Sequence, residues 1–116
     1  MHALILKICH AEEWKAAEGA GIYPGSRKDR EDGFLHFSTA EQLMGTLTRY
    51  YADANDLVLV AVDADALGGA LKHEPSRDGQ LFPHLYGELP QTAVRWVRPI
   101  ARGPQGSFVL PAELTA

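Results

Sequence analysis

The sequence predicts a single α+β domain that combines two main helices with a mostly antiparallel sheet, continuous or split. An apolar, β-branched run at residues 57–62 predicts a central strand, and an amphipathic pattern at residues 38–51 predicts a helix. Short extended segments separated by turn residues fill the second half of the chain. At 116 residues the chain can bury one sizeable core. We therefore expect one domain over residues 1–116, with a core from roughly residue 3 to residue 102.

Composition and charge exclude several classes of protein. The net charge is −4, and no block rich in lysine and arginine occurs, so a nucleic-acid partner is not expected. No apolar run approaches the ~18 residues of a membrane span, and the first residues lack the features of a signal peptide. We expect a cytoplasmic protein without a membrane partner. Cys9 is the single cysteine, which excludes an internal disulfide and predicts a small buried side chain.

The first third of the chain predicts a strand, a helix and a charged segment. Residues 3–9 are apolar on both faces except for Lys7, which predicts a strand covered on both sides. Residues 10–19 predict a helix, with Trp14 as its anchor in the core. Residues 27–32 are six charged residues in a row, which indicates either a solvated loop or a mobile flap beside His36.

The stretch from residue 32 to residue 39 is central to the interpretation. It predicts a short strand in which Leu35 and Phe37 face the core, whereas Phe34 and His36 face the opposite side. Residues 38–41, Ser-Thr-Ala-Glu, match a capping box and predict a helix that runs to about residue 51. The apolar stripe expected for this helix comprises Leu43, Met44, Leu47, Tyr50 and Tyr51.

After the strand at residues 57–62, the chain alternates between extended segments and turns. We expect extended segments at 70–74 and 81–87, an alternating strand at 93–100 and a last short strand at 107–110. Because proline cannot donate to a strand ladder, Pro83 predicts that the segment at 81–87 lies at a sheet edge or outside the ladder.

Three groups of residues are candidates for a binding or catalytic site. The first is His36 followed by Ser38 and Thr39, because an imidazole beside a helix N-terminus can recognise a phosphate or a ribose hydroxyl. The second spans Glu74, Ser76 and Arg77, and is either a surface ion pair or an anion site in which Arg77 is a bidentate clamp. The third is His84 with Tyr86, which share one face of an extended segment and are expected to line the same cleft as His36.

Other chemistries have weaker support. A metal site built from His10, His36, His73 or His84 lacks any tight ligand spacing, so we expect no metal. Ser38 or Ser76 as a nucleophile lacks the G-x-S-x-G elbow. The sequence contains neither a P-loop nor a G-x-G-x-x-G motif.

The order of these motifs closely resembles a bacterial family, domain-of-unknown-function family 952, over roughly residues 4–100. The resemblance is carried by Trp14, residues 23–26, residues 32–39, Gln42, Tyr50, Tyr51, residues 57–60, residues 74–77 and residues 82–87. More distantly, the chain is similar to the ADP-ribosyltransferase fold, in particular the RNA 2′-phosphotransferase branch. In those enzymes, the residues that match His36, Ser38 and Arg49 hold NAD or a 2′-phosphate. The resemblance therefore implies NAD as a candidate cofactor.

The chain also departs from those enzymes. Residues 8–11, Ile-Cys-His-Ala, stand where the relatives carry His-Gly-Thr, and Asp32-Gly33 replaces an arginine. Only Glu88 is a candidate for the transferase carboxylate. Fold similarity alone does not establish NAD chemistry.

Three hypotheses remain open. In the first, the chain is a glycosyl- or phosphotransferase-type enzyme on a nucleotide-like or phosphorylated ligand, with His36 and His84 as acid–base groups, Arg77 and Arg49 on the anion, and Tyr50 or Tyr86 stacked on a ring. In the second, it is a non-catalytic module that binds a nucleotide metabolite or a protein. In the third, the histidines are structural.

Overall fold

Strand β4 (Leu57–Asp63) is the centre of the main sheet, whose order is β1-β4-β8. Strand β1 (Leu4–His10) pairs with it antiparallel from Leu4 opposite Asp63 to His10 opposite Leu57. Strand β8 (Val94–Pro99) lies on the other side, with an irregularity in register after Ala61. The structure, a computed structural model, describes residues 3–114, and for Arg77 only the backbone. The central, doubly covered strand predicted at residues 57–62 is confirmed.

A second sheet has the order β3-β6-β5, formed by β3 (Leu35–His36), β6 (Leu81–Leu85) and β5 (Leu71–Pro75). Strand β6 is its centre, so the prediction that Pro83 would place this segment at an edge is wrong. The carbonyl of Pro83 accepts a hydrogen bond from the Phe37 N–H at 3.0 Å. Because the N–H and C=O of one residue point to the same side of an antiparallel strand, the missing N–H faces β3. That strand ends at His36, so little pairing is lost there.

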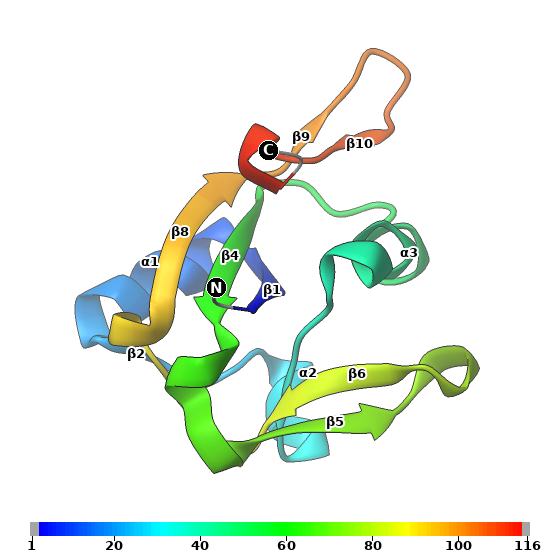
Figure 1. Ribbon diagram of the computed structural model, residues 1–116. Helices are drawn as coiled ribbons and strands as arrows, with labels where there is room; N and C mark the ends of the chain where they lie inside the picture. The colour runs from blue at the N-terminus through cyan, green and yellow to red at the C-terminus, as the bar shows by residue number, and fades with distance from the viewer. Residues whose placement is uncertain (1–2, 115–116) are drawn as a thin grey trace.

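The two sheets meet at one bridge between Leu6 and Ser38. The two residues exchange both backbone hydrogen bonds, each 2.8 Å long. The sheet is therefore split, and Figure 1 shows β5 and β6 lying apart from β1, β4 and β8. Two further pairs complete the strands: β2 (Ile22–Tyr23) with β7 (Leu89–Pro90), and β9 (Ala101–Arg102) with β10 (Phe108–Val109).

Three α-helices accompany the sheets in the described part of the chain, rather than the two expected: α1 (Ala11–Ala20), α2 (Arg27–Asp32) and α3 (Ala40–Tyr50). Helix α2 replaces the loop expected at residues 27–32. It begins at a capping box in which Ser26 and Asp29 satisfy each other's backbone N–H groups, and it ends at Gly33, whose φ of 84° is left-handed. Of its six residues only Asp29 is buried. Helix α2 therefore arises from caps rather than from an apolar face.

Helix α3 starts one residue later than its predicted cap. Thr39, not Ser38, is the N-cap, and it forms a capping box with Gln42. Leu43 and Leu47 are fully buried, whereas Met44 and Tyr50 are exposed. The apolar stripe is thus narrower than predicted.

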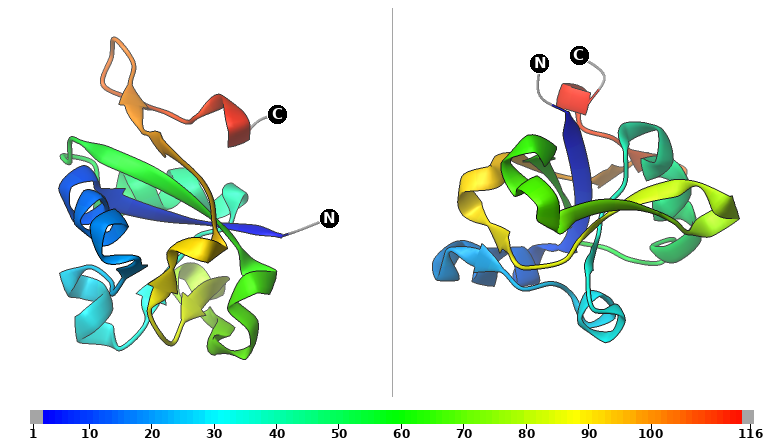
Figure 2. Two further views of the ribbon diagram at one scale, coloured as in Figure 1. Left: turned by 90° about the vertical axis from the view of Figure 1, so that its left-hand side faces the viewer. Right: turned by 60° about the horizontal axis from the view of Figure 1, so that its bottom comes forward.

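Helices α1 and α3 cover opposite faces of the main sheet, because alternate residues of β1 and β4 enter two separate clusters. One cluster joins Trp14 of α1 to Val60 and Val62, and the other joins Leu43 and Leu47 of α3 to Leu59. Figure 2 shows the helices packed around the sheets from two further sides. The described residues form one α+β domain with small antiparallel sheets, as the sequence predicts. None of their helices is long and apolar enough to cross a membrane.

Candidate functional site

A cavity of about 490 Å³ lies along the outer edge of β1, the side away from β4. Its wall comes from β1, α2, β3, α3 and β6. This volume falls within the range of roughly 300–1,000 Å³ typical of small-molecule sites. The cavity thus occupies the place where the split between the two sheets leaves β1 without a full neighbouring strand.

Both candidate imidazoles line this cavity. The pairing of β3 with β6 places His36 directly opposite His84, and the two ring centroids are 5.5 Å apart. The ring of Phe34 stacks on His84 at 4.1 Å and lies 4.7 Å from His36. The structure therefore brings together two histidines that lie far apart in the sequence.

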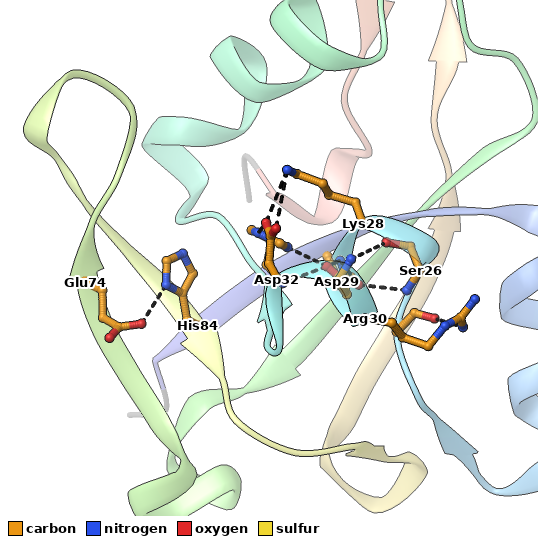
Figure 3. Close-up of polar contacts among 10 residues, drawn as sticks. Ser26, Lys28, Asp29, Arg30, Asp32, Glu74 and His84 are labelled. Carbon is orange, nitrogen blue, oxygen red and sulfur yellow. Dashed lines mark hydrogen bonds and ion pairs between the residues drawn. The ribbon is translucent and has the colours of Figure 1, made fainter.

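The side chain of Asp29 connects α2 to both sheets. Its carboxylate accepts hydrogen bonds from the backbone N–H of Ser26 at 2.8 Å and of His36 at 3.0 Å. It also lies 2.6 Å from Nδ1 of His36 and 2.9 Å from Nζ of Lys7. Figure 3 shows Asp29 beside Ser26, with dashed lines joining the two residues. One buried carboxylate therefore holds β1, α2 and β3 in a fixed relation.

The contacts of Asp29 decide its charge. Burial raises the pKa of this carboxyl, but the bond to His36, the positive charge of Lys7 and the N–H of Ser26 act in the opposite direction and outweigh it. The pKa of Asp29 therefore lies well below its usual range. Lys7 is almost fully buried, so its ammonium and this carboxylate form a buried ion pair.

A second carboxylate contacts the other side of the His36 ring. Oδ2 of Asp32 lies 2.8 Å from Nε2 of His36 and 3.3 Å from Nζ of Lys28. The contacts form one series, Lys7, Asp29, His36, Asp32 and Lys28, with a lysine at each end and the imidazole between the two carboxylates.

His84 has a different environment. Its Nδ1 lies 2.8 Å from Oε1 of Glu74, which also accepts a hydrogen bond from the Tyr86 hydroxyl at 2.7 Å. The bonds from Tyr86 and His84 lower the pKa of Glu74, and the same bond to Glu74 raises the pKa of Tyr86. In Figure 3 the second ring nitrogen of His84 points away from Glu74. Because His84 lines the cavity, this nitrogen is the one available to a ligand.

The other candidate residues divide into two sets. Ser38, Tyr50 and Ser76 line the cavity, and Oγ of Ser38 lies 3.2 Å from the Thr46 hydroxyl. Glu74 and Tyr86 bind to His84 or to each other rather than lining the cavity.

Thr39, Arg49 and Arg77 are not among the described lining residues. The Thr39 hydroxyl caps α3, and Gln42 takes the Thr39 N–H, so this helix end directs fewer free donors at a ligand than expected. The exposed Arg49 guanidinium lies 5.9 Å from the ring of Tyr50. The side chain of Arg77, the predicted anion clamp, lies outside the part of the chain that the structure describes.

Sequence reasoning missed Lys7, Asp29, Asp32 and Tyr51, all of which line the cavity. Burial raises the pKa of Tyr51 to about 12, so its phenol remains neutral. Lys7 could have been identified from the sequence as a site residue, because it is a lone lysine in an otherwise apolar strand. The spacing of Ser26 and Asp29 before Gly33 matches helix caps and was a signal for α2.

The geometry thus provides acid–base groups and hydroxyls beside aromatic rings. Among residues 3–114, no group of three histidine, cysteine or acidic side chains is arranged to hold a metal ion. A small polar ligand is the kind of molecule that this wall suits.

Comparison with known proteins places the chain in a family. The family described as "Protein of unknown function (DUF952)" matches residues 8–97, whereas no curated protein matches the chain. The crystal structure of protein CC0527 from Caulobacter crescentus is 39% identical with a TM-score of 0.91, over 97% of this chain and 99% of that chain. The solution NMR structure of CC0527 is 41% identical with a TM-score of 0.80, over 89% of each chain. The chain therefore belongs to the DUF952 family.

Proposed function

We propose that the cavity is the active site of an enzyme in which His84 exchanges a proton with a small polar ligand. The observation that carries this proposal is the pair formed by His84 and Glu74. One ring nitrogen contacts a carboxylate at 2.8 Å, while the ring lines the cavity. A carboxylate on one nitrogen fixes the orientation and tautomer of a histidine and leaves the other nitrogen for proton transfer.

The role of His36 differs from that of His84 in this proposal. Both nitrogens of His36 contact carboxylates, at 2.6 and 2.8 Å, so neither is open to a ligand without a rearrangement. We assign to His36 the positioning of Asp32 and of the neighbouring wall. His84 is then the acid–base group.

A nucleotide-like or phosphorylated compound is the ligand class that we propose. The rings of Tyr50 and Tyr51 and several hydroxyls suit a base and a sugar, and Lys28 is a cation at the wall. The resemblance of the sequence to ADP-ribosyltransferases supports the same class and makes NAD the first compound to test. A transferase reaction on such a ligand would need a hydroxyl or phosphate acceptor near His84.

A second candidate is a module that binds the ligand without turnover. Glu88, the only match to the transferase carboxylate, is exposed and does not line the cavity. This position favours binding alone, because the carboxylate that matches the transferase residue lies away from the cavity.

Ligand binding and turnover in two matched histidine variants separate these candidates. NAD, ADP-ribose and a 2′-phosphate compound are titrated into the protein by NMR, and products are followed by chromatography. If the protein is an enzyme, His84→Gln should lower turnover by about 100-fold or more and change the affinity for the ligand little. The control His73→Gln alters an exposed histidine on β5 and should change neither quantity.

Each alternative has its own outcome. Binding without product, unchanged in His84→Gln, would favour the module. Binding that leaves the resonances of His36 and His84 unmoved would exclude the cavity as the site.

A further inference from the structure

The charged side chains that line the cavity are already matched with one another. Lys7 pairs with Asp29 at 2.9 Å, and Lys28 pairs with Asp32 at 3.3 Å. The ring of His36 lies between the two carboxylates. Both lysines that line the described cavity therefore already have a carboxylate partner.

Hydroxyls, the His84 imidazole and apolar side chains make up the rest of the wall. Tyr50, Tyr51 and Ser76 contribute hydroxyls, and His84 contributes a ring nitrogen that points away from Glu74 (Figure 3). The phenol of Tyr51 stays neutral because burial raises its pKa to about 12. Apolar side chains fill the space between these groups: Leu6, Ile8, Phe37 and Phe82. Such a wall suits a ring with hydroxyl substituents.

We propose that the inner cavity takes an uncharged ring compound that carries hydroxyl groups, of which a nucleoside is the simplest example, and that any phosphate on the ligand stays at the rim beside Lys28. The proposal rests on the function proposed for His84, because a ligand hydroxyl is the group that its free nitrogen would contact. A phosphate inside would compete with the carboxylates of Asp29 and Asp32 for the lysines that they already pair with, and like charges at short distance disfavour binding. The side chain of Lys28 is 72% exposed, so it reaches a phosphate that remains in solvent.

Calorimetry and NMR with three probes test this selectivity: adenosine, adenosine 5′-monophosphate and inorganic phosphate. We expect adenosine and the monophosphate to bind, with dissociation constants within about 10-fold, and inorganic phosphate to bind at least about 100-fold more weakly. Tyr51→Phe, which removes the Tyr51 hydroxyl, should weaken the affinity for adenosine by about 3- to 10-fold, the effect of one hydrogen bond.

One lysine variant and one arginine variant test where the phosphate of the ligand lies. Lys28→Ala should remove any advantage of the monophosphate over adenosine and leave adenosine binding unchanged. Arg27→Ala is the matched control, because Arg27 lies on the same helix, is 90% exposed and pairs with Glu31 outside the cavity. It should change neither ligand.

The outcomes separate this inference from the proposed function. Inorganic phosphate that binds as tightly as adenosine and shifts the resonances of Lys7 or His36 would overturn the inference, even if His84 remains essential. The absence of adenosine binding would also overturn it. Selectivity as expected, together with turnover that is unchanged in His84→Gln, would support the inference and contradict the role proposed for His84.

Discussion

The buried ion pair of Lys7 and Asp29 allows a quantitative prediction, because its two partners have unequal surroundings. Asp29 accepts from Lys7, from the backbone N–H groups of Ser26 and His36, and contacts the ring of His36. The ammonium of Lys7 has Asp29 as its carboxylate partner and lies 6.0 Å from the ring of Phe37. Removal of Asp29 therefore leaves a buried charge, whereas removal of Lys7 leaves a carboxylate that keeps three contacts.

The expected losses in unfolding free energy follow from this difference. Asp29→Leu leaves the Lys7 ammonium buried without its carboxylate partner, which costs about 3–5 kcal/mol. It also removes one of the two hydrogen bonds of the capping box of α2, which costs about 1 kcal/mol more. Lys7→Met removes one charged hydrogen bond and should cost about 1–2 kcal/mol. The double variant eliminates the stranded charge, so we expect it to be about 2 kcal/mol more stable than Asp29→Leu alone.

Urea unfolding followed by circular dichroism measures these free energies. Lys28→Met is the control, because its pair with Asp32 is at the surface and its loss should cost less than about 1 kcal/mol. A cost for Lys7→Met equal to that of Asp29→Leu would contradict the reasoning. A double variant no more stable than Asp29→Leu would contradict it as well.

Three further predictions concern neighbouring groups. The pKa of Asp29 is lower in the folded protein than its unfolded value of about 3.9, so the ionised carboxylate stabilises the fold above that pH. The difference in unfolding free energy between wild type and Asp29→Asn should therefore shrink as the pH falls from about 4 to 2. Urea unfolding at several pH values measures this difference. Gly25→Ala should destabilise the protein by at least about 2 kcal/mol more than Gly33→Ala in the same assay. A Cβ at residue 25 would lie 2.9 Å from Cβ of Asp29, whereas a Cβ at residue 33 would meet open space, so that only the positive φ is strained there. Burial raises the pKa of Cys9 to about 11, so the native thiol should not react with a disulfide reagent at pH 8 and should react fully in denaturant; fast reaction of the folded protein would contradict this burial.

Patterns of apolar residues predict most of the scaffold, because burial produces those patterns. The run at residues 57–62 becomes β4, and the predicted helix ending near residue 51 becomes α3, ending at Tyr50. The alternation around His36 also holds, since Leu35 and Phe37 are buried while His36 is half-buried. Convergence of the two imidazoles follows from the pairing of His36 with His84, which local patterns suggest but cannot fix.

Apolar patterns do not predict helix α2, because this helix has no apolar face. Six charged residues indicate solvent, yet one of them, Asp29, is buried through contacts with residues distant in the sequence. The caps at Ser26 and Gly33 indicate a helix but not which carboxylate turns inward. The central position of Pro83 likewise depends on where β3 ends, a long-range feature.

The ionic network has a clearer role in geometry than in stability. Well-packed apolar residues often stabilise a protein as much as a buried ion pair does, so such a pair is weak evidence for a stabilising role. Here the split sheet leaves β1 and the segment after β3 joined by the bridge between Leu6 and Ser38. Asp29 adds a second connection, from Lys7 on β1 to His36 on β3, and brings α2 against the cavity. Because His36 lies opposite His84, the position of the catalytic candidate depends on this connection. An apolar replacement of Lys7 and Asp29 could thus fold and still widen the distance between the two imidazoles.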